Sequence, residues 1–303
     1  MLFGNGGLPD NDKCRLIKAD VRDVDAWTKA CEGQEAVIYL ASISRELMCQ
    51  NNEKLAYAVN VESFRPAVIA AKEAGVKRFI YGSSVAVYGS SDHEMTEDEP
   101  LAPTTIYGRG KAACEEILRG LWPSSGFSVT ITRSASVCGY SPRQRLDLTL
   151  NRMAHDAAKL RLIKVEGGAQ KRSHVSIKDL TRFYRLLLDL PPSRINGEIF
   201  NVVETNQRVK ESAMMVARVV GHTAIEVGPR TDDRSYAVDG SKAKSMLGFE
   251  IKNPIEDAVR DIAVRVEAGY WKDSLTNPVY QNMVPELSLD MYGFPPFDTY
   301  VHD

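Results

Sequence analysis

The sequence "RFIYGSS" (residues 78–84) runs from bulky apolar and aromatic residues into a glycine and two serines. Its length and its enrichment in aromatic and β-branched residues are typical of a buried strand. The preceding residues, 52–74, form an amphipathic pattern that predicts one long helix, and Gly75 fits the position just beyond a helix end. A helix that leads into a continuous apolar strand indicates a parallel sheet covered by helices.

The same alternation continues through the first half of the chain. We expect further strands at 15–20, 36–41, 128–135 and 198–203, and helices at 24–31 and 107–122. This order predicts an α/β fold built on a doubly wound, Rossmann-like parallel sheet. Ligands in this class bind beyond the carboxyl ends of the strands, so Ser83 and Ser84 are candidate site residues.

Beyond about residue 140 the pattern becomes looser and indicates a smaller, mixed α/β region. The helices expected there span 145–160, 177–190, 208–220, 240–247 and 254–267. From residue 272 the chain is rich in Pro, Tyr and Asn without a period, and this predicts a C-terminal arm over 272–303 that is draped over the body or disordered.

Composition and charge exclude several classes of protein. The 303 residues are 44% apolar and 26% charged, with a net charge of −2 and scattered Lys and Arg, so we expect no nucleic-acid partner. The apolar runs are too short for a membrane span and no signal peptide is seen, which predicts a cytoplasmic protein without a membrane partner. Five cysteines without a C-x-x-C pair indicate buried apolar residues rather than disulfides, and no metal site is expected.

Two side chains with complementary chemistry lie at the start of the expected helix 107–122. Tyr107 and Lys111 are four residues apart, so they share one face of the helix. A nearby ammonium, the positive helix end and a bound cofactor would favour the phenolate of a tyrosine whose ordinary pKa is near 10. With Ser84, the pair could move a hydroxyl proton. Taken alone, Y-x-x-x-K is also a pattern that occurs by chance.

Longer segments make this pattern specific. The sequence resembles the NAD-dependent epimerase/dehydratase branch of the extended short-chain dehydrogenase/reductase family, whose known members act on nucleotide sugars. The resemblance is carried by "ADVRD" (19–23), "AVIYLAS" (36–42), "NVESFRPAVIAAKEAGVKRFIYGSSVAVYG" (60–89), "TEDEPLAPTTIYGRGKAACEEIL" (96–118), "RSASVCGYSP" (133–142), "RSHVSIKDL" (172–180), "GEIFNVV" (197–203) and "RSYAVDGSKAKSMLGF" (234–249). These segments follow the family's order and spacing.

The resemblance assigns expected roles to residues of the first region. It implies that Tyr107 is the catalytic base and acid, that Lys111 binds the nicotinamide ribose and lowers the pKa of the tyrosine, and that Ser84 orients the sugar oxygen in preference to Ser83. The cofactor positions that it implies are Asp20 and Val21 beside the adenine, Leu40, Ala41 and Ser42 along the phosphates and ribose, and Asn60 near the nicotinamide. Without the resemblance, Asp20 is equally well interpreted as a helix start, Ala41 as a core residue and Asn60 as a cap.

The second region matches the family's nucleotide-sugar site. The resemblance places Asn151, Arg172 and Arg234 at the nucleotide and its diphosphate. Guanidinium groups suit a diphosphate because each can donate to two oxygens at once. Asp232 or Asp233 could instead pair with Arg234 at the surface, and His174 reads as structural.

The resemblance also divides the chain and implies its ligands. Residues 1–140 and 171–203 are expected to form the dinucleotide-binding domain, and 141–170 and 204–271 the nucleotide-sugar-binding region. The implied cofactor is NAD, with NADP not excluded. The implied partners are a nucleotide-diphosphate sugar and a second copy in a homodimer.

The residues after Ser84 bear on the reaction. The family's dehydratases carry an acidic pair there, and its decarboxylases carry a glutamate, whereas this chain has Val85 and Ala86. Without that acid or base, the simplest remaining chemistry is oxidation at C4 of the sugar and return of the hydride to the other face. The sequence therefore predicts 4-epimerisation. A ketoreductase with the same trio, a reductase of apolar small molecules and a non-catalytic sugar-nucleotide-binding protein stay open.

Two departures from the family stand out. "RSASVCGYSP" carries Ser136, Cys138 and Tyr140 where the family's pattern differs, which predicts a different substrate pocket. In the family, a first strand, a Gly-rich turn and a helix precede "ADVRD", and we expect that unit to be missing here. Gly4, Gly6 and Gly7 lack the preceding strand and following helix of a phosphate-binding turn.

Overall fold

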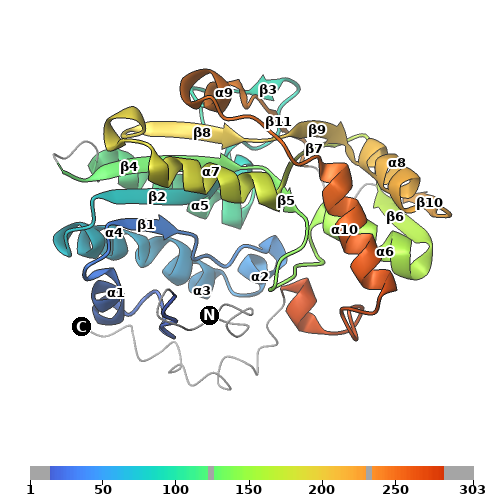
Figure 1. Cartoon of the computed structure of the whole chain (residues 1–303), viewed down its shortest axis with the longest axis horizontal. Helices are drawn as coiled ribbons and strands as arrows, with labels where there is room; N and C mark the ends of the chain where they lie inside the picture. The colour runs from blue at the N-terminus through green and yellow to red at the C-terminus, as the bar shows by residue number, and fades with distance from the viewer. Residues whose placement is uncertain (1–13, 122–125, 230–233, 283–303) are drawn as a thin grey trace.

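The central sheet confirms the fold class. The structure is a computed structural model that describes residues 14–121, 126–229 and 234–282. Its four-stranded sheet has the order β1-β2-β4-β8, with every neighbouring pair parallel (Figure 1). The strands are β1 (Ala36–Tyr39), β2 (Arg78–Ser84), β4 (Ser128–Ser134) and β8 (Glu198–Val202). Ser84 lies beside Ser134 in the register, so the two carboxyl ends meet at one edge.

Helices cover both faces of this sheet, as a doubly wound fold requires. One face buries an aromatic core that includes Tyr39, Phe64 and Phe79. Its helices are α1 (Val24–Cys31), α4 (Phe64–Glu73) and α5 (Ile106–Leu121). The other face packs against α7 (Ile177–Asp189) and α9 (Ser241–Leu247), with Phe183 against Phe200. In Figure 1, α7 crosses in front of the sheet and α5 lies behind it.

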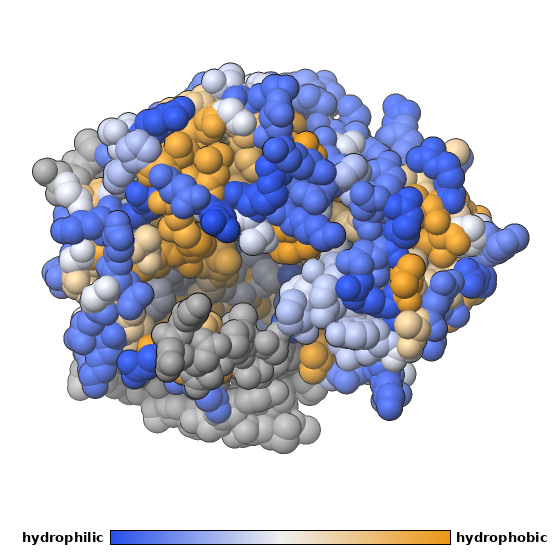
Figure 2. Space-filling model, in the orientation of Figure 1, coloured by the Kyte–Doolittle hydropathy of each residue, from blue (hydrophilic) through white to orange (hydrophobic). Residues whose placement is uncertain are grey.

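The smaller region has a hydrophobic core of its own. The helices α6 (Thr149–Leu160), α8 (Val209–Val220) and α10 (Ile255–Glu267) pack together and against the pair β6 (Leu162–Glu166) and β10 (Ala224–Gly228), on the right of Figure 1. A three-stranded sheet of β5 (Ser136–Cys138), β7 (Lys171–Ser176) and β9 (Thr205–Arg208) joins this region to the central sheet. Hydrophilic residues cover much of the face shown in Figure 2, with apolar patches between them.

Two expectations about the first region are wrong, and the strand expected over 36–41 is shorter than predicted. Residues 15–20 form no strand, and Ile17 is 44% exposed, so this stretch lacks both the ladder and the burial of an inner strand. The helix expected over 52–74 is broken into α3 (Glu53–Tyr57), a π-helical turn at Ala58–Glu62 and α4, and α2 (Glu46–Asn51) precedes it. The expected strand 36–41 ends at Tyr39, which releases the following residues into a loop.

Other local predictions fit the structure. Gly75 follows α4 with a φ of +87°, a conformation that favours glycine. Cys31, Cys49, Cys114 and Cys138 are buried, and Cys14 is partly exposed. No helix of the described chain is long and apolar enough to cross a membrane.

The first residues of the expected C-terminal arm lie against the body. Leu146 N donates to Tyr280 O over 2.7 Å, and Arg143 donates to Asn282 Oδ1 over 2.9 Å. Residues 283–303 of the arm, and the glycines near the start of the chain, lie outside the described residues.

Candidate active site

A cavity of about 480 Å³ opens at the carboxyl ends of the sheet strands. Its walls come from the loop after β1, the end of β2, the start of α5, the end of β4 and the segment 139–151 of the smaller region. The expected site residues that line it are Leu40, Ser42, Ser83, Ser84, Tyr107, Lys111, Asn151 and Arg234. The fold thus brings together residues that are almost 200 positions apart in the sequence.

Tyr107 and Lys111 lie side by side in the first turns of α5. Lys111 Nζ donates to Gly82 O at the end of β2 over 2.7 Å. It lies 5.7 Å from the centre of the Tyr107 ring and 4.8 Å from that of Tyr81. Tyr107 is half-buried and Ser84 lies within hydrogen-bond reach of its hydroxyl. The geometry therefore assembles the Ser, Tyr and Lys trio at one wall of the cavity.

Burial controls the protonation of this trio in the unliganded site. Desolvation raises the pKa of Tyr107 to about 12, and the charge of Arg145 and the hydrogen bond with Ser84 oppose that increase. Desolvation also lowers the pKa of Lys111 to about 8. Arg145 is thus the cation that does most to lower the pKa of Tyr107. The sequence predicted this role for Lys111.

The structure distinguishes the two neighbouring serines. Ser83 Oγ donates to the buried Glu115 carboxylate over 2.5 Å, so its hydroxyl proton is already engaged. Ser84 Oγ accepts from Ala86 N over 3.2 Å, which leaves its proton available to the cavity. This difference favours Ser84 over Ser83 as the hydroxyl that contacts a ligand.

The loop after β1 forms the expected cofactor side of the cavity. Leu40 is 57% exposed at the rim, and Ala41 packs against the core beneath. The buried Asn60 holds this loop: its Oδ1 accepts from Ile43 N over 2.7 Å and from Ser42 Oγ over 3.2 Å, and its Nδ2 donates to Ile43 O. Asn60 lies in the π-helical turn, an irregularity often found at functional sites. Its side chain acts here as a support for the loop.

Asp20 and Val21 do not line the cavity. The Asp20 carboxylate accepts from the Arg22 guanidinium over 3.0 and 2.7 Å, and Val21 packs against the core below the sheet. Their predicted place beside an adenine ring stays a prediction.

The smaller region supplies the opposite wall. Asn151 Oδ1 accepts from Gly139 N over 2.9 Å and its Nδ2 donates to Arg145 O over 2.8 Å, so this amide organises the segment 139–145. Arg172 is buried, lies over the Tyr236 ring at 5.4 Å and donates to the backbone carbonyl of Arg234. Arg172 thus lies behind the wall, and Arg234 lies on it. Asp232 and Asp233 lie outside the described residues.

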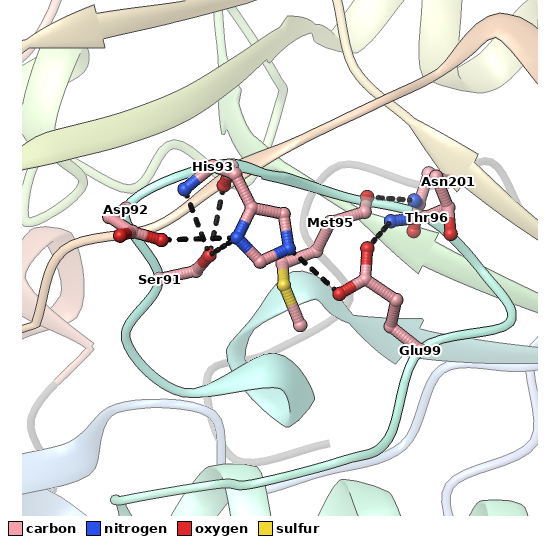
Figure 3. A network of polar contacts seen from close by, with 7 residues as sticks. All are labelled: Ser91, Asp92, His93, Met95, Thr96, Glu99 and Asn201. Atoms are coloured by element: carbon pink, nitrogen blue, oxygen red, sulfur yellow. Dashed lines mark hydrogen bonds and ion pairs between the residues drawn. The ribbon is translucent and has the colours of Figure 1, made fainter.

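A polar network fixes the wall that carries Arg234. Ser91 N donates to Ser235 O over 2.9 Å, and β3 (Glu94–Met95) pairs with β11 (Ala237–Val238). Figure 3 shows His93 between Asp92 and Glu99, and the Asn201 amide directed at Met95 O. His93 Nδ1 lies 3.1 Å from Asp92 Oδ1, and its Nε2 lies 2.8 Å from Glu99 Oε2. The Glu99 and Asp92 carboxylates raise the pKa of His93.

Sequence reasoning missed three charged residues of the cavity. Arg143 and Arg145 line it from the smaller region, and Arg145 is held by Asp147 over 3.0 and 2.6 Å and by Ser44 over 3.0 Å. Glu46 lines it from α2. The "RQRLD" segment offered a charge pattern for Arg145, but nothing local to the sequence pointed to Glu46.

A family model described as "NAD dependent epimerase/dehydratase family" matches residues 5–202. The chain belongs to this family. A dTDP-D-glucose 4,6-dehydratase of Mus musculus is 31% identical over 231 residues, which cover 71% of this chain and 63% of the relative. An N-acetyl-alpha-D-glucosaminyl-diphospho-ditrans,octacis-undecaprenol 4-epimerase of Escherichia coli O157:H7 is 31% identical, over 61% of this chain and 54% of the relative. The chain therefore spans less than two thirds of the length of these two family members.

The fold agrees with solved structures of family members. A UDP-glucuronic acid 4-epimerase of Bacillus cereus, in complex with UDP-glucuronic acid and NAD, superposes with a TM-score of 0.77 at 20% identity. The match covers 86% of this chain and 84% of that chain. The family model thus confirms the predicted resemblance to the epimerase/dehydratase branch, and the superposition confirms the Rossmann-like fold.

Proposed function

We propose that this chain is an NAD-dependent epimerase that inverts C4 of the sugar in a nucleotide-diphosphate sugar. The sheet and its loop after β1 would bind the dinucleotide, and the region around α6 would bind the sugar nucleotide. Family membership supports the class of reaction, and the cavity supports the choice within that class.

The choice of epimerisation over elimination of water rests on the carboxylates that line the cavity. Elimination of water from a sugar needs an acid for the leaving hydroxyl and a base for a carbon-bound proton, in addition to the group that serves the oxidation. Among the described residues that line the cavity, the only carboxylate is Glu46. Both of its oxygens accept backbone N–H groups of α5, over 3.0 Å each. Epimerisation requires no carboxylate in addition to the Ser, Tyr and Lys trio, and the one carboxylate of the described lining is occupied by the backbone of α5.

The sheet side of the cavity is where we place the dinucleotide. Gly82 lets the loop after β1 approach the end of β2 closely there, because a Cβ at this position would lie 2.5 Å from Leu40 Cδ2 and 3.1 Å from the Tyr184 hydroxyl. Leu40, Ser42 and Lys111 would hold the cofactor. We propose that four further residues belong to that site or support it: Asp20, Val21, Ala41 and Asn60. Bound NAD would take up the hydride from C4 and give it back.

The remaining chemistry belongs to the chain's own side chains. Ser84 would donate to the reacting sugar oxygen, and the Tyr107 oxygen would take and return the hydroxyl proton. Arg234 would hold the diphosphate through a forked guanidinium, with Arg172 supporting it from behind. Because burial raises the pKa of Tyr107 to about 12, the phenol is protonated in the unliganded site, and positive charge brought by a ligand would favour the phenolate.

The experiment is a product analysis with NAD and three substrates: UDP-glucose, UDP-glucuronic acid and dTDP-glucose. We expect a C4 epimer from at least one of them, formed about 100-fold or more slowly by Tyr107→Phe. A 4-keto-6-deoxy product from dTDP-glucose would instead support a dehydratase, which the mouse relative makes the second candidate. Absence of NAD binding and of any product would overturn the enzymatic proposal.

A further inference from the structure

The helix that carries Tyr107 begins with three backbone donors that are paired with side chains. The first N–H groups of a helix have no partner within the helix. Here Ile106 N and Tyr107 N donate to the two oxygens of Glu46, over 3.0 Å each, and Gly108 N donates to Thr105 Oγ1 over 3.0 Å. One carboxylate that is distant in the sequence therefore holds the backbone N–H of Tyr107 and that of the residue before it.

The position of Glu46 depends on the loop after β1. Glu46 is the first residue of α2, and Cys49 in the same helix donates its thiol to Ile43 O over 3.3 Å. Asn60 holds both the N–H and the carbonyl of Ile43. Gln50 Nε2 donates to Glu46 Oε1 over 3.3 Å and helps to orient the carboxylate. The carboxylate is thus fixed to the loop that forms the expected cofactor side of the cavity.

We propose that Glu46 is a positioning residue for Tyr107, which links the loop 40–46 to the start of α5. Two parallel hydrogen bonds set the place and direction of the first helical turn, and hence of the phenol. The negative charge also offsets the positive end of the helix, which otherwise favours an anion there. The assigned effect on turnover rests on the proposed epimerase function, whereas the effect on the helix does not.

Several titratable groups of the described residues surround the phenol of Tyr107. They are Arg145, Cys49, Tyr81, Tyr184 and Lys111, and Glu46 binds the backbone of the same residue. Of these, Arg145 favours the phenolate, and Cys49 and Tyr184 disfavour it. Removal of the Glu46 charge should therefore lower the pKa of Tyr107.

Three variants separate position from charge. Glu46→Gln keeps one acceptor and removes the charge, Glu46→Ala removes both, and Glu46→Asp keeps the charge on a shorter arm. Glu53→Gln is the matched control, because this exposed acid also begins a short helix and does not line the cavity. Thermal unfolding of each variant shows that it is folded.

Amide hydrogen exchange tests the clamp without any assay of activity. In the full chain, the amides of Ile106 and Tyr107 should exchange at least about tenfold faster in Glu46→Ala than in the wild type or in Glu53→Gln. Unchanged exchange at both amides would overturn the proposal, whatever the enzyme does.

Kinetics test the consequence for Tyr107. Glu46→Gln should lower kcat about tenfold with KM for the nucleotide sugar nearly unchanged, and should move the acidic limb of the pH profile down by about half a pH unit. Glu46→Asp should keep that limb in place. Wild-type kcat and an unmoved limb in Glu46→Gln, alongside faster exchange, would overturn the positioning role. If the wild type itself turns over no sugar nucleotide, the proposed function fails, and the exchange result still decides whether Glu46 holds the helix.

Discussion

Tyr107 stands at the meeting point of β2, α5 and the segment that carries Arg145. Its hydroxyl is the group on which the proposed proton transfer depends. Tyr107→Phe removes that hydroxyl and keeps the ring, so we expect kcat to fall about 100-fold or more with NAD binding unchanged. Steady-state kinetics and a cofactor titration measure the two effects.

Tyr57→Phe is the control for this change. Tyr57 is 54% exposed and does not line the cavity, so its loss should leave kcat unchanged. Full activity of Tyr107→Phe would remove the phenol from the mechanism.

His174 provides a second test at the scale of one residue. It is fully buried, and neither ring nitrogen has a hydrogen-bond partner in the described structure. Burial, aided by the nearby charge of Arg172, lowers the pKa of His174 to about 3. The unfolded chain, with a histidine pKa near 6.5, therefore binds the proton more readily, and the free energy of unfolding falls as pH drops from about 6.5 towards 3.

His174→Leu replaces the imidazole with a side chain of similar volume, so it should remove this contribution to the pH dependence of the free energy of unfolding. The variant should lose about 2 kcal/mol less stability than the wild type between about pH 6.5 and pH 4.5, as measured by denaturant unfolding at each pH. Parallel pH curves for the two proteins would show that the imidazole is protonated or solvated in the folded state.

At the scale of elements, α5 is attached to the sheet by a buried ion pair. Arg133 in β4 donates to the Glu115 carboxylate over 2.7–3.2 Å, and both side chains are fully buried. Ser83 and Tyr88 complete the network. A buried charge that loses its partner is costly, so Glu115→Gln should lower the free energy of unfolding by about 3 kcal/mol.

The neighbouring Glu116 gives the matched comparison. It lies one position along the same helix and is exposed, so Glu116→Gln should change stability little. Chemical denaturation of both variants measures the difference. Equal, small effects would mean that Arg133 finds other partners when the carboxylate is neutralised.

Elements with a clear apolar period could be predicted closely from the sequence. The helix expected at 24–31 is α1, and the strand at 78–84 is β2, because caps, period and composition agree there. The helix expected over 52–74 is interrupted, since the π-helical turn depends on contacts of Asn60 with the loop after β1 and on the Cys114 thiol, which donates to Asn60 O over 2.9 Å. Local propensity carries no trace of such contacts.

The candidate site, too, could be predicted from the sequence only in part. Its trio could be found from the spacing of Tyr107 and Lys111 and from the family's segments. Glu46 could not, because the donors that it binds lie 60 and 61 positions away and meet it only after the sheet has formed. Arg145, likewise, lies in the smaller region, and its charge lowers the pKa of the phenol only once the fold has formed.

At the scale of the molecule, the cavity lies between two hydrophobic cores, so ligands that bridge it should stabilise the whole chain. A ligand at about 100 times its Kd adds roughly 2.7 kcal/mol to the free energy of unfolding. We expect NAD to raise Tm and a sugar nucleotide to raise it further. Arg234→Ala should lose most of the second increase and keep the first, as measured by thermal shift. Loss of both, or of neither, would contradict the place of Arg234 on the substrate wall.

The central claim is that the hydrogen at C4 leaves the sugar as a hydride and returns to the same carbon on the opposite face. The most direct test uses a UDP-sugar labelled with deuterium at C4, incubated with the protein and NAD in ordinary water, with both epimers analysed by NMR and mass spectrometry. We expect the product epimer to keep the deuterium at C4, and we expect Tyr107→Phe to form that product about 100-fold or more slowly. An epimer that has exchanged its label for solvent hydrogen, or a labelled substrate that remains unchanged with NAD bound, would contradict this claim.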